Sequence, residues 1–158
     1  MELLMSPNYS FEWMPFAERH YAKTFAKKYK NSWLETRDNI DEVCKRIDRM
    51  LDFDRADLIY SVGYHKLVKL DFAVAGTHIS PKKSGNRCLL FIDEELRHVQ
   101  ILIAYSKNDI GPPNETAKWK RLLRRCNTKW QIGPPNETAK WKRVIKAEYK
   151  NIAEIFSL

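Results

Sequence analysis

Residues 65–105 read HKLVKLDFAVAGTHISPKKSGNRCLLFIDEELRHVQILIAY, and this stretch decides the fold. Apolar and polar side chains alternate from His65 to Ala75, which indicates a strand with one buried face. A loop rich in glycine, serine, proline and lysine follows at residues 76–85. Two further apolar runs, Arg87–Asp93 and His98–Tyr105, are typical of strands. Because the three runs follow one another closely, we expect an antiparallel meander.

The segment before this sheet has the periodicity of helices. Residues 9–14 alternate as a short strand does, whereas residues 16–30 and 33–51 place apolar side chains three and four positions apart. The link between the two helical stretches is short, so an antiparallel helical hairpin is expected. The predicted class is α+β, with a single domain over residues 1–158. It consists of a small, mostly antiparallel sheet packed on an N-terminal helical hairpin, with a duplicated C-terminal helix.

The duplication is exact over twelve residues. IGPPNETAKWKR occurs at residues 110–121 and again at 132–143, which defines two tandem loop-helix segments, 110–131 and 132–153. Structural repeats that arise from folding preserve a pattern rather than identity, and they recur at least three times. A single perfect doubling therefore indicates a tandem duplication of the coding sequence, natural or engineered.

Two nearly equal segments compete for one docking place on the domain. We expect the first copy to dock, because it directly follows its strand. The second copy would then expose an apolar stripe formed by Trp141, Val144, Ile145 and Tyr149. Such a stripe favours a homodimer, formed through the duplicated helix or by helix exchange between chains.

Composition narrows the class of protein. The chain has 158 residues and a net charge of +8, and residues 110–150 alone hold 11 Lys or Arg and 3 Glu. The duplicated region thus carries the whole excess charge, so the basic balance by itself is weak evidence for a nucleic-acid partner. We expect neither a membrane span nor a signal peptide. Three widely spaced cysteines fit neither a disulfide framework nor a zinc site, which favours a reducing cytoplasm.

The ordered set of elements resembles the RelE/ParE superfamily of small toxins, and its HigB-like branch in particular. Four features carry the resemblance: a strand that ends at a glycine, the loop Lys83-Ser-Gly-Asn-Arg87, two strands joined by an acidic turn, and Tyr105-Ser-Lys107 after the last strand. The helical hairpin comes before them, and NETAKWKRVIKAEY follows. The resemblance covers residues 9–109 and one copy of the terminal helix.

The resemblance implies a toxin of a toxin–antitoxin pair, which cuts mRNA on the ribosome without a metal or other cofactor. A small cognate antitoxin would hold it inactive by binding across the sheet and helices. The ParE-like branch, which inhibits DNA gyrase and lacks the nuclease residues, is the alternative within the same superfamily. A non-enzymatic binding module and an engineered, helix-exchanged variant also remain open.

RNA cleavage by the 2′-hydroxyl group needs a base, cations that stabilise the phosphorane, and an acid for the leaving oxygen. The sequence shows no carboxylate and histidine set suited to a metal, so Lys, Arg, His and Tyr must supply these groups. Arg87 matches the family's strand arginine and would bind the scissile phosphate bidentately. Lys82 and Lys83 precede it in the loop. The remaining candidates are Tyr105, Lys107 and His78, with His98 as a further acid or base.

Each candidate also has a structural interpretation. Lys82 and Lys83 could simply solubilise a loop, and Arg87 could be an ordinary exposed residue of a strand. Tyr105 could pack against the sheet rather than take part in chemistry. His98, next to a polar turn, is expected to be exposed and uninvolved.

Overall fold

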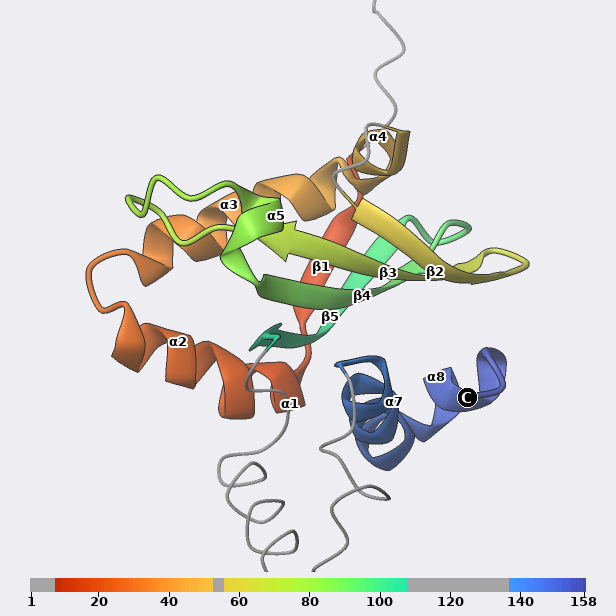
Figure 1. Cartoon of the computed structure of the whole chain (residues 1–158). Coiled ribbons are helices and arrows are strands. Elements are labelled where there is room, and N and C mark those ends of the chain that lie inside the picture. Colours follow the sequence, from red (N-terminus) through yellow and green to blue (C-terminus); the bar gives the residue numbers. More distant parts are fainter. Residues whose placement is uncertain (1–7, 53–55, 108–136) are drawn as a thin grey trace, which may run out of the picture. The chain divides into compact units, whose positions relative to one another are not determined.

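The computed structural model describes residues 8–52, 56–107 and 137–158 (Figure 1). The chain divides into two compact units, Met1–Ala104 and Tyr105–Leu158, and each unit is described by itself. Helices and a five-stranded, mostly antiparallel sheet make up the structure, so the predicted α+β class is confirmed.

The sheet has the strand order β1-β5-β4-β3-β2. Its strands are β1 (Ser10–Trp13), β2 (Ala56–Val62), β3 (His65–Phe72), β4 (Asn86–Asp93) and β5 (His98–Ser106). The four strands that alternation predicts are confirmed, and β3 pairs antiparallel with β4 as expected. β1 pairs in parallel with β5, which places the first strand of the chain beside the last one.

The edge strand β2 was not predicted. It pairs antiparallel with β3 through a two-residue turn, in which Gly63 has a φ of 58° that favours glycine. The register shifts between Leu58 and Tyr60, so a bulge interrupts the simple alternation of faces. A strand with a bulge at the edge of a sheet lacks the clean period of two that the other strands have.

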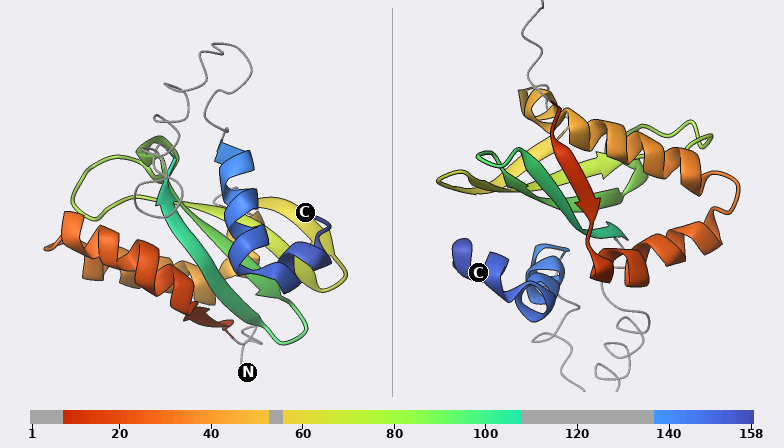
Figure 2. Two further views of the ribbon diagram at one scale, coloured as in Figure 1. Left: turned by 90° about the horizontal axis from the view of Figure 1, so that it is seen from below. Right: turned by 180° about the vertical axis from the view of Figure 1, so that it is seen from behind.

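The helical hairpin forms as expected and covers one face of the sheet (Figure 2). Its first arm is continuous and comprises α1 (Pro15–Ala17), a π-helical turn η1 (Glu18–Ala22) and α2 (Lys23–Lys28). Its second arm is α3 (Trp33–Lys45), and α4 (Ile47–Asp52) follows. The single helix expected over residues 33–51 therefore breaks at Arg46, whose φ of −120° and ψ of 29° are not helical.

Aromatic rings join the hairpin to the sheet. Phe25 of α2 stacks on Trp33 of α3 with ring centroids 5.2 Å apart, and it meets Phe72 of β3 edge to face at 5.5 Å. Trp33 also meets Trp13 of β1 edge to face at 6.0 Å. These rings exclude water from the space between the two arms and the sheet, and so fix the hairpin on this face.

The described part of the second unit includes the helices α7 (Glu137–Glu148) and α8 (Lys150–Ile155). Trp141, Val144, Ile145 and Tyr149 are all buried, so the prediction that the second copy exposes this stripe is wrong. Burial of an apolar stripe of this size lowers the free energy of the folded chain, and the stripe is buried within a single chain. The first copy, residues 110–131, lies outside the described residues, and the expectation that it docks is left untested. The homodimer was predicted from an exposed stripe on the second copy. It stays a prediction, although that stripe is buried.

Candidate functional site

A cross-strand ion pair lies near the end of the β3–β4 hairpin that leads into the loop. Asp71 of β3 is the register partner of Arg87 at the start of β4. The Arg87 Nε–H donates a hydrogen bond of 3.1 Å to Asp71 Oδ1. Only 17% of the Arg87 side chain and 14% of the Asp71 side chain are exposed. The arginine predicted to bind phosphate is therefore held in a fixed place by a carboxylate that the sequence analysis did not select.

The electrostatics of this pair reflect its partial burial. Desolvation raises the pKa of Asp71 above its usual range, and the neighbouring Arg87 guanidinium opposes that shift without cancelling it. Asp71 is thus a carboxyl group with increased proton affinity beside a permanent cation. That combination suits a site that handles both a phosphate and a proton.

A second pair continues the charged row on the same sheet face. Side chains two positions apart along a strand share a face, which puts Lys69 beside Asp71. Lys69 is the register partner of Asp57 on β2, and its Nζ lies 4.0 Å from Asp57 Oδ2. Asp57 could not be found from the sequence, because β2 itself was not predicted.

A short helix carries the two loop lysines a few residues before Arg87 in the chain. Helix α5 (Pro81–Ser84) ends at Gly85, whose φ of 75° reverses the chain into β4. Ser84 Oγ donates to the carbonyl of Phe72 at 2.6 Å and accepts from the Asn86 N–H at 3.1 Å. One hydroxyl group therefore ties the loop to the end of β3 and the start of β4.

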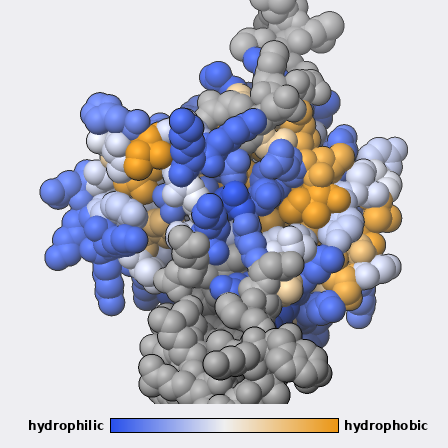
Figure 3. All heavy atoms as spheres, viewed as in Figure 1, coloured by the Kyte–Doolittle hydropathy of each residue, from blue (hydrophilic) through white to orange (hydrophobic). Residues whose placement is uncertain are grey.

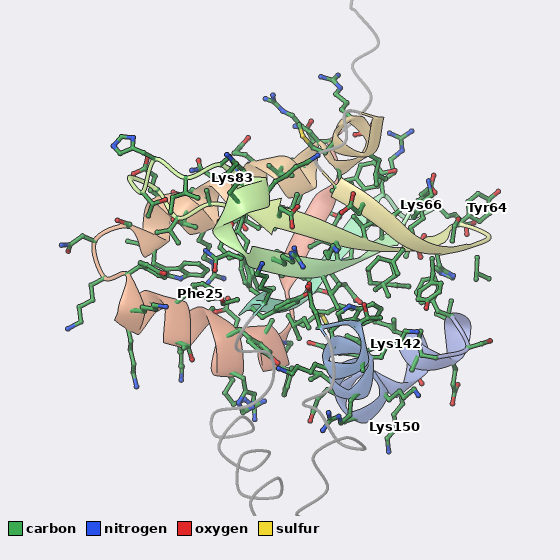
Figure 4. The ribbon with its side chains drawn as sticks, viewed as in Figure 1. Phe25, Tyr64, Lys66, Lys83, Lys142 and Lys150 are labelled. Atoms are coloured by element: carbon green, nitrogen blue, oxygen red, sulfur yellow. The ribbon has the colours of Figure 1, made fainter. Side chains whose placement is uncertain are left out.

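Three of the six predicted residues therefore lie on one short segment. Lys82 and Lys83 are exposed on α5, a few residues before Arg87 (Figure 4). His78 lies earlier in the same loop, is exposed, and has a φ of 56°. Positive φ is uncommon for a residue other than glycine, although histidine adopts it more readily than most.

The other two predicted residues belong to the second unit. Tyr105 is buried, and its hydroxyl group donates a hydrogen bond of 2.9 Å to Glu137 Oε1. Lys107 is exposed. The structural interpretation of Tyr105 as a packing residue fits its burial, and the hydroxyl group is engaged with a carboxylate.

A hollow adjoins the ion pair between α3 and the end of β3. It has a volume of about 310 Å³, and Asp71 is among the residues that line it. Ile40, Leu70 and Phe72 give it an apolar wall, while Asn39 and Glu42 contribute polar groups.

His98 was expected to be exposed and uninvolved in the chemistry; it is half-buried instead, and its contacts belong to the fold. A hydrogen bond of 2.7 Å joins Ser10 Oγ to His98 Nδ1, and His98 Nε2 lies 3.2 Å from Glu12 Oε1. The half-buried ring thereby links β5 to β1. Since it follows the β4–β5 turn while Arg87 begins β4, His98 lies at the other end of that hairpin. We assign it a structural role.

Across residues 8–52, 56–107 and 137–158, no group of three or more His, Cys, Asp or Glu side chains is arranged to hold a metal ion. Helices in the same ranges are all too short or too polar to cross a membrane. Comparisons with models of protein families, with curated proteins and with solved structures give no match. The function therefore has to be argued from the site itself.

Proposed function

We propose that this chain cleaves RNA by metal-independent attack of a 2′-hydroxyl group on the neighbouring phosphate. More particularly, we propose a toxin of the RelE/ParE superfamily that cuts mRNA on the ribosome. The observation that carries the proposal is the partly buried Asp71–Arg87 pair, which follows the exposed lysines of α5 by a few residues in the chain. A phosphate-binding cation, an adjacent carboxylate and further cations are the groups that such a reaction requires.

In the proposed step, a base removes the proton of the 2′-hydroxyl group and the 2′ oxygen attacks phosphorus. The bond from phosphorus to the 5′ oxygen breaks, and that oxygen takes up a proton. The products are a 2′,3′-cyclic phosphate and a free 5′-hydroxyl group. Arg87 binds the non-bridging oxygens, where negative charge increases in the transition state. Lys83 and Lys82 add positive charge at the same phosphate.

Asp71 orients the guanidinium group through its contact with Arg87 Nε. Planar arginine recognises phosphate through parallel N–H groups, so a fixed plane reduces the entropy lost on binding. His78 stays a proposed acid or base. Tyr105 and Lys107 belong to the second unit, and they stay predictions that the resemblance implies. A cognate antitoxin, a ribosome-bound mRNA and a cytoplasmic location belong to the same proposal.

The test is cleavage of a defined mRNA in a reconstituted translation reaction. We expect cuts at codon-related positions with the wild-type chain. Arg87→Ala should reduce the cleavage rate by about 100- to 1000-fold, the usual effect of removing one group that stabilises transition-state charge. Arg87→Lys is the matched control, because it retains the charge but loses the planar donor pair.

The two variants separate the possible outcomes. If Arg87→Lys restores most of the rate, charge alone matters and the bidentate contact is not needed. If the folded wild-type chain leaves the mRNA intact, the nuclease proposal fails. A DNA gyrase supercoiling assay would then test the alternative within the superfamily.

A further inference from the structure

The first arm of the helical hairpin carries a run of cations that the proposed site does not use. Residues 19–31 contain five basic side chains and no acidic one. All five are exposed on η1, on α2 or in the turn after α2. They are Arg19, Lys23, Lys27, Lys28 and Lys30.

The spacing of these residues forms a row. Arg19, Lys23 and Lys27 are four residues apart, so they follow one another on successive turns. Eight residues of helix span about 12 Å at 1.5 Å per residue. Lys28 and Lys30 extend the positive charge towards the end of the arm. We call these five residues the α2 basic face. In Figure 3 the surface over α2 is largely hydrophilic.

Within the described part of the chain, no acidic side chain pairs with this charge. Glu18, the acid immediately before the face, is engaged by Arg37 of α3 in a two-pronged ion pair, in which Arg37 Nη1 donates to Glu18 Oε2 at 2.9 Å. None of the ion pairs among residues 8–52 and 56–107 involves a member of the α2 basic face. Lys28 Nζ lies 5.4 Å from the centroid of the Tyr29 ring, a contact that leaves its charge in place.

We infer that the α2 basic face binds the phosphate backbone of a folded RNA, as an anchoring surface separate from the Arg87 site. The inference rests on the proposed function for its biological role, since it identifies where a nuclease of this kind would hold its RNA partner. Binding itself can be measured without any cleavage. Lysine predominates over arginine on the face, which suits contacts to phosphate charge rather than to planar base edges.

The surface chemistry favours a nucleic acid over a protein or a membrane, and the proposed function makes that nucleic acid an RNA. A protein partner needs an apolar, desolvated centre in its interface, and a membrane needs apolar side chains that enter the lipid. On α2, Phe25 is buried, and the large exposed hydrophobic residues of the described chain all lie outside this arm. Charge without an apolar anchor is typical of sequence-independent contact with a nucleic-acid backbone.

The experiment measures the affinity for a fluorescent RNA hairpin by anisotropy between 50 and 200 mM salt, without ribosomes. The test variant is Lys23→Gln/Lys27→Gln in the full chain. The matched control is Lys146→Gln/Lys150→Gln, which removes the same two charges from exposed positions of the second unit. Circular dichroism and thermal unfolding establish that both variants are folded.

Each lysine that contacts a phosphate contributes about one to the slope of log affinity against log salt. We therefore expect the slope of the test variant to fall by about two and its affinity at low salt to fall about tenfold or more. The control should retain the wild-type slope. Equal losses in both variants would mean that only net charge matters, and unchanged binding in the test variant would likewise overturn the inference.

Two further arms separate this inference from its alternatives. Vesicles with anionic headgroups that bind more tightly than the RNA, with the same dependence on Lys23 and Lys27, would assign the face to a membrane and overturn the inference. In an Arg87→Ala background, Lys23→Gln/Lys27→Gln should still lower the slope by about two, because the α2 basic face is separate from the Arg87 site. If the chain binds RNA through α2 but cuts no mRNA, the proposed nuclease fails while the anchoring surface stands.

Discussion

The two arms of the helical hairpin solve the same packing problem with opposite surfaces. α2 buries Phe25 and α3 buries Trp33 and Ile40 against the same face of the sheet. Their solvent-facing sides differ in sign. Residues 19–31 carry five basic and no acidic side chains, whereas α3 carries four acidic and two basic ones.

The charges of α3 largely serve the fold. Arg37 pairs with Glu18 and lies over the Trp13 ring, with 4.6 Å from its Cζ to the ring centroid. Asp41 accepts a hydrogen bond of 2.8 Å from Trp13 Nε1. Among the described residues, none of the ion pairs involves a cation of α2, and Lys28 alone lies over a ring, that of Tyr29. In both α2 and α3, the apolar stripe determines where the helix packs. The charge on the other side of α2 is not used in this way, which indicates a partner.

The largest expected effect is on the free energy of unfolding. It tests whether the two arms pack equally firmly on the sheet. Phe25→Ala should lower the free energy of unfolding by about 3–5 kcal/mol, and Ile40→Ala by about 2–5 kcal/mol, since each leaves a cavity in a packed core. Urea denaturation followed by circular dichroism measures both. Lys27→Ala, on the exposed side of α2, is the control and should change stability by less than about 0.5 kcal/mol.

If Phe25→Ala lowered the free energy of unfolding much less than Ile40→Ala, the two arms would not pack equally firmly on the sheet. That result would mean that α2 is held loosely, and that its charge is not presented by a rigid element.

A smaller effect is expected where α3 holds the loop that leads to the proposed site. Thr36 is fully buried, and its hydroxyl group donates to the Ser32 carbonyl at 2.7 Å while accepting from the Ala75 N–H at 2.9 Å. Thr36→Val keeps the shape but removes the acceptor of the Ala75 N–H, at a cost of about 1–3 kcal/mol, while the Ser32 carbonyl still accepts from the backbone N–H of residue 36. Denaturant unfolding measures that cost.

Hydrogen exchange at the Ala75 amide gives the site-specific result. We expect it to become faster in Thr36→Val, while amides of α2 exchange as in the wild type. Thr36→Ser is the control, because it retains the hydroxyl group. An unchanged Ala75 amide would show that water replaces the lost bond.

Periodicity was sufficient to predict the elements that both arms and most of the sheet use. Strands β3, β4 and β5 have a clear apolar period, and the hairpin follows from spacings of three and four. β2 was not predicted, because its bulge at Leu58–Tyr60 disrupts the alternation of apolar and polar side chains. The position of β1 beside β5 depends on a parallel pairing between residues such as Ser10 and His98, which no local pattern encodes.

The candidate site was predictable in part for a related reason. Arg87 and the two loop lysines stand out as residue types in a short segment. Asp71 could be recognised as the partner of Arg87 only from the register of β3 and β4. The sequence does not fix that register, because a loop separates the two strands. The fate of the duplicated helix could not be predicted either, since two identical twelve-residue stretches carry no information on which one is buried.

The smallest expected effect is the pH dependence of stability that comes from Asp41, the acid of α3 that accepts a hydrogen bond from Trp13 of β1. Burial is the main cause of a raised pKa at Asp41, and the hydrogen bond from Trp13 and the charge of Arg37 only partly oppose it. A carboxyl group whose pKa is higher in the folded state holds its proton more tightly there than in the unfolded chain. Its contribution to stability is therefore complete below the ordinary value of 3.8, and it declines as pH rises through the folded pKa.

Asp41→Asn removes this titration while its side-chain oxygen can still accept from Trp13. We expect the variant and the wild type to be equally stable at about pH 3, below the ordinary carboxyl range. The variant should become the more stable of the two as pH rises towards neutrality, by a small margin in urea titrations at several pH values. A stability difference that does not change with pH, or a wild type that gains on the variant, would contradict this assignment. With no change over pH, the charge of Asp41 would be as uninvolved in the fold as the lysines of α2, and the contrast between the two arms would weaken.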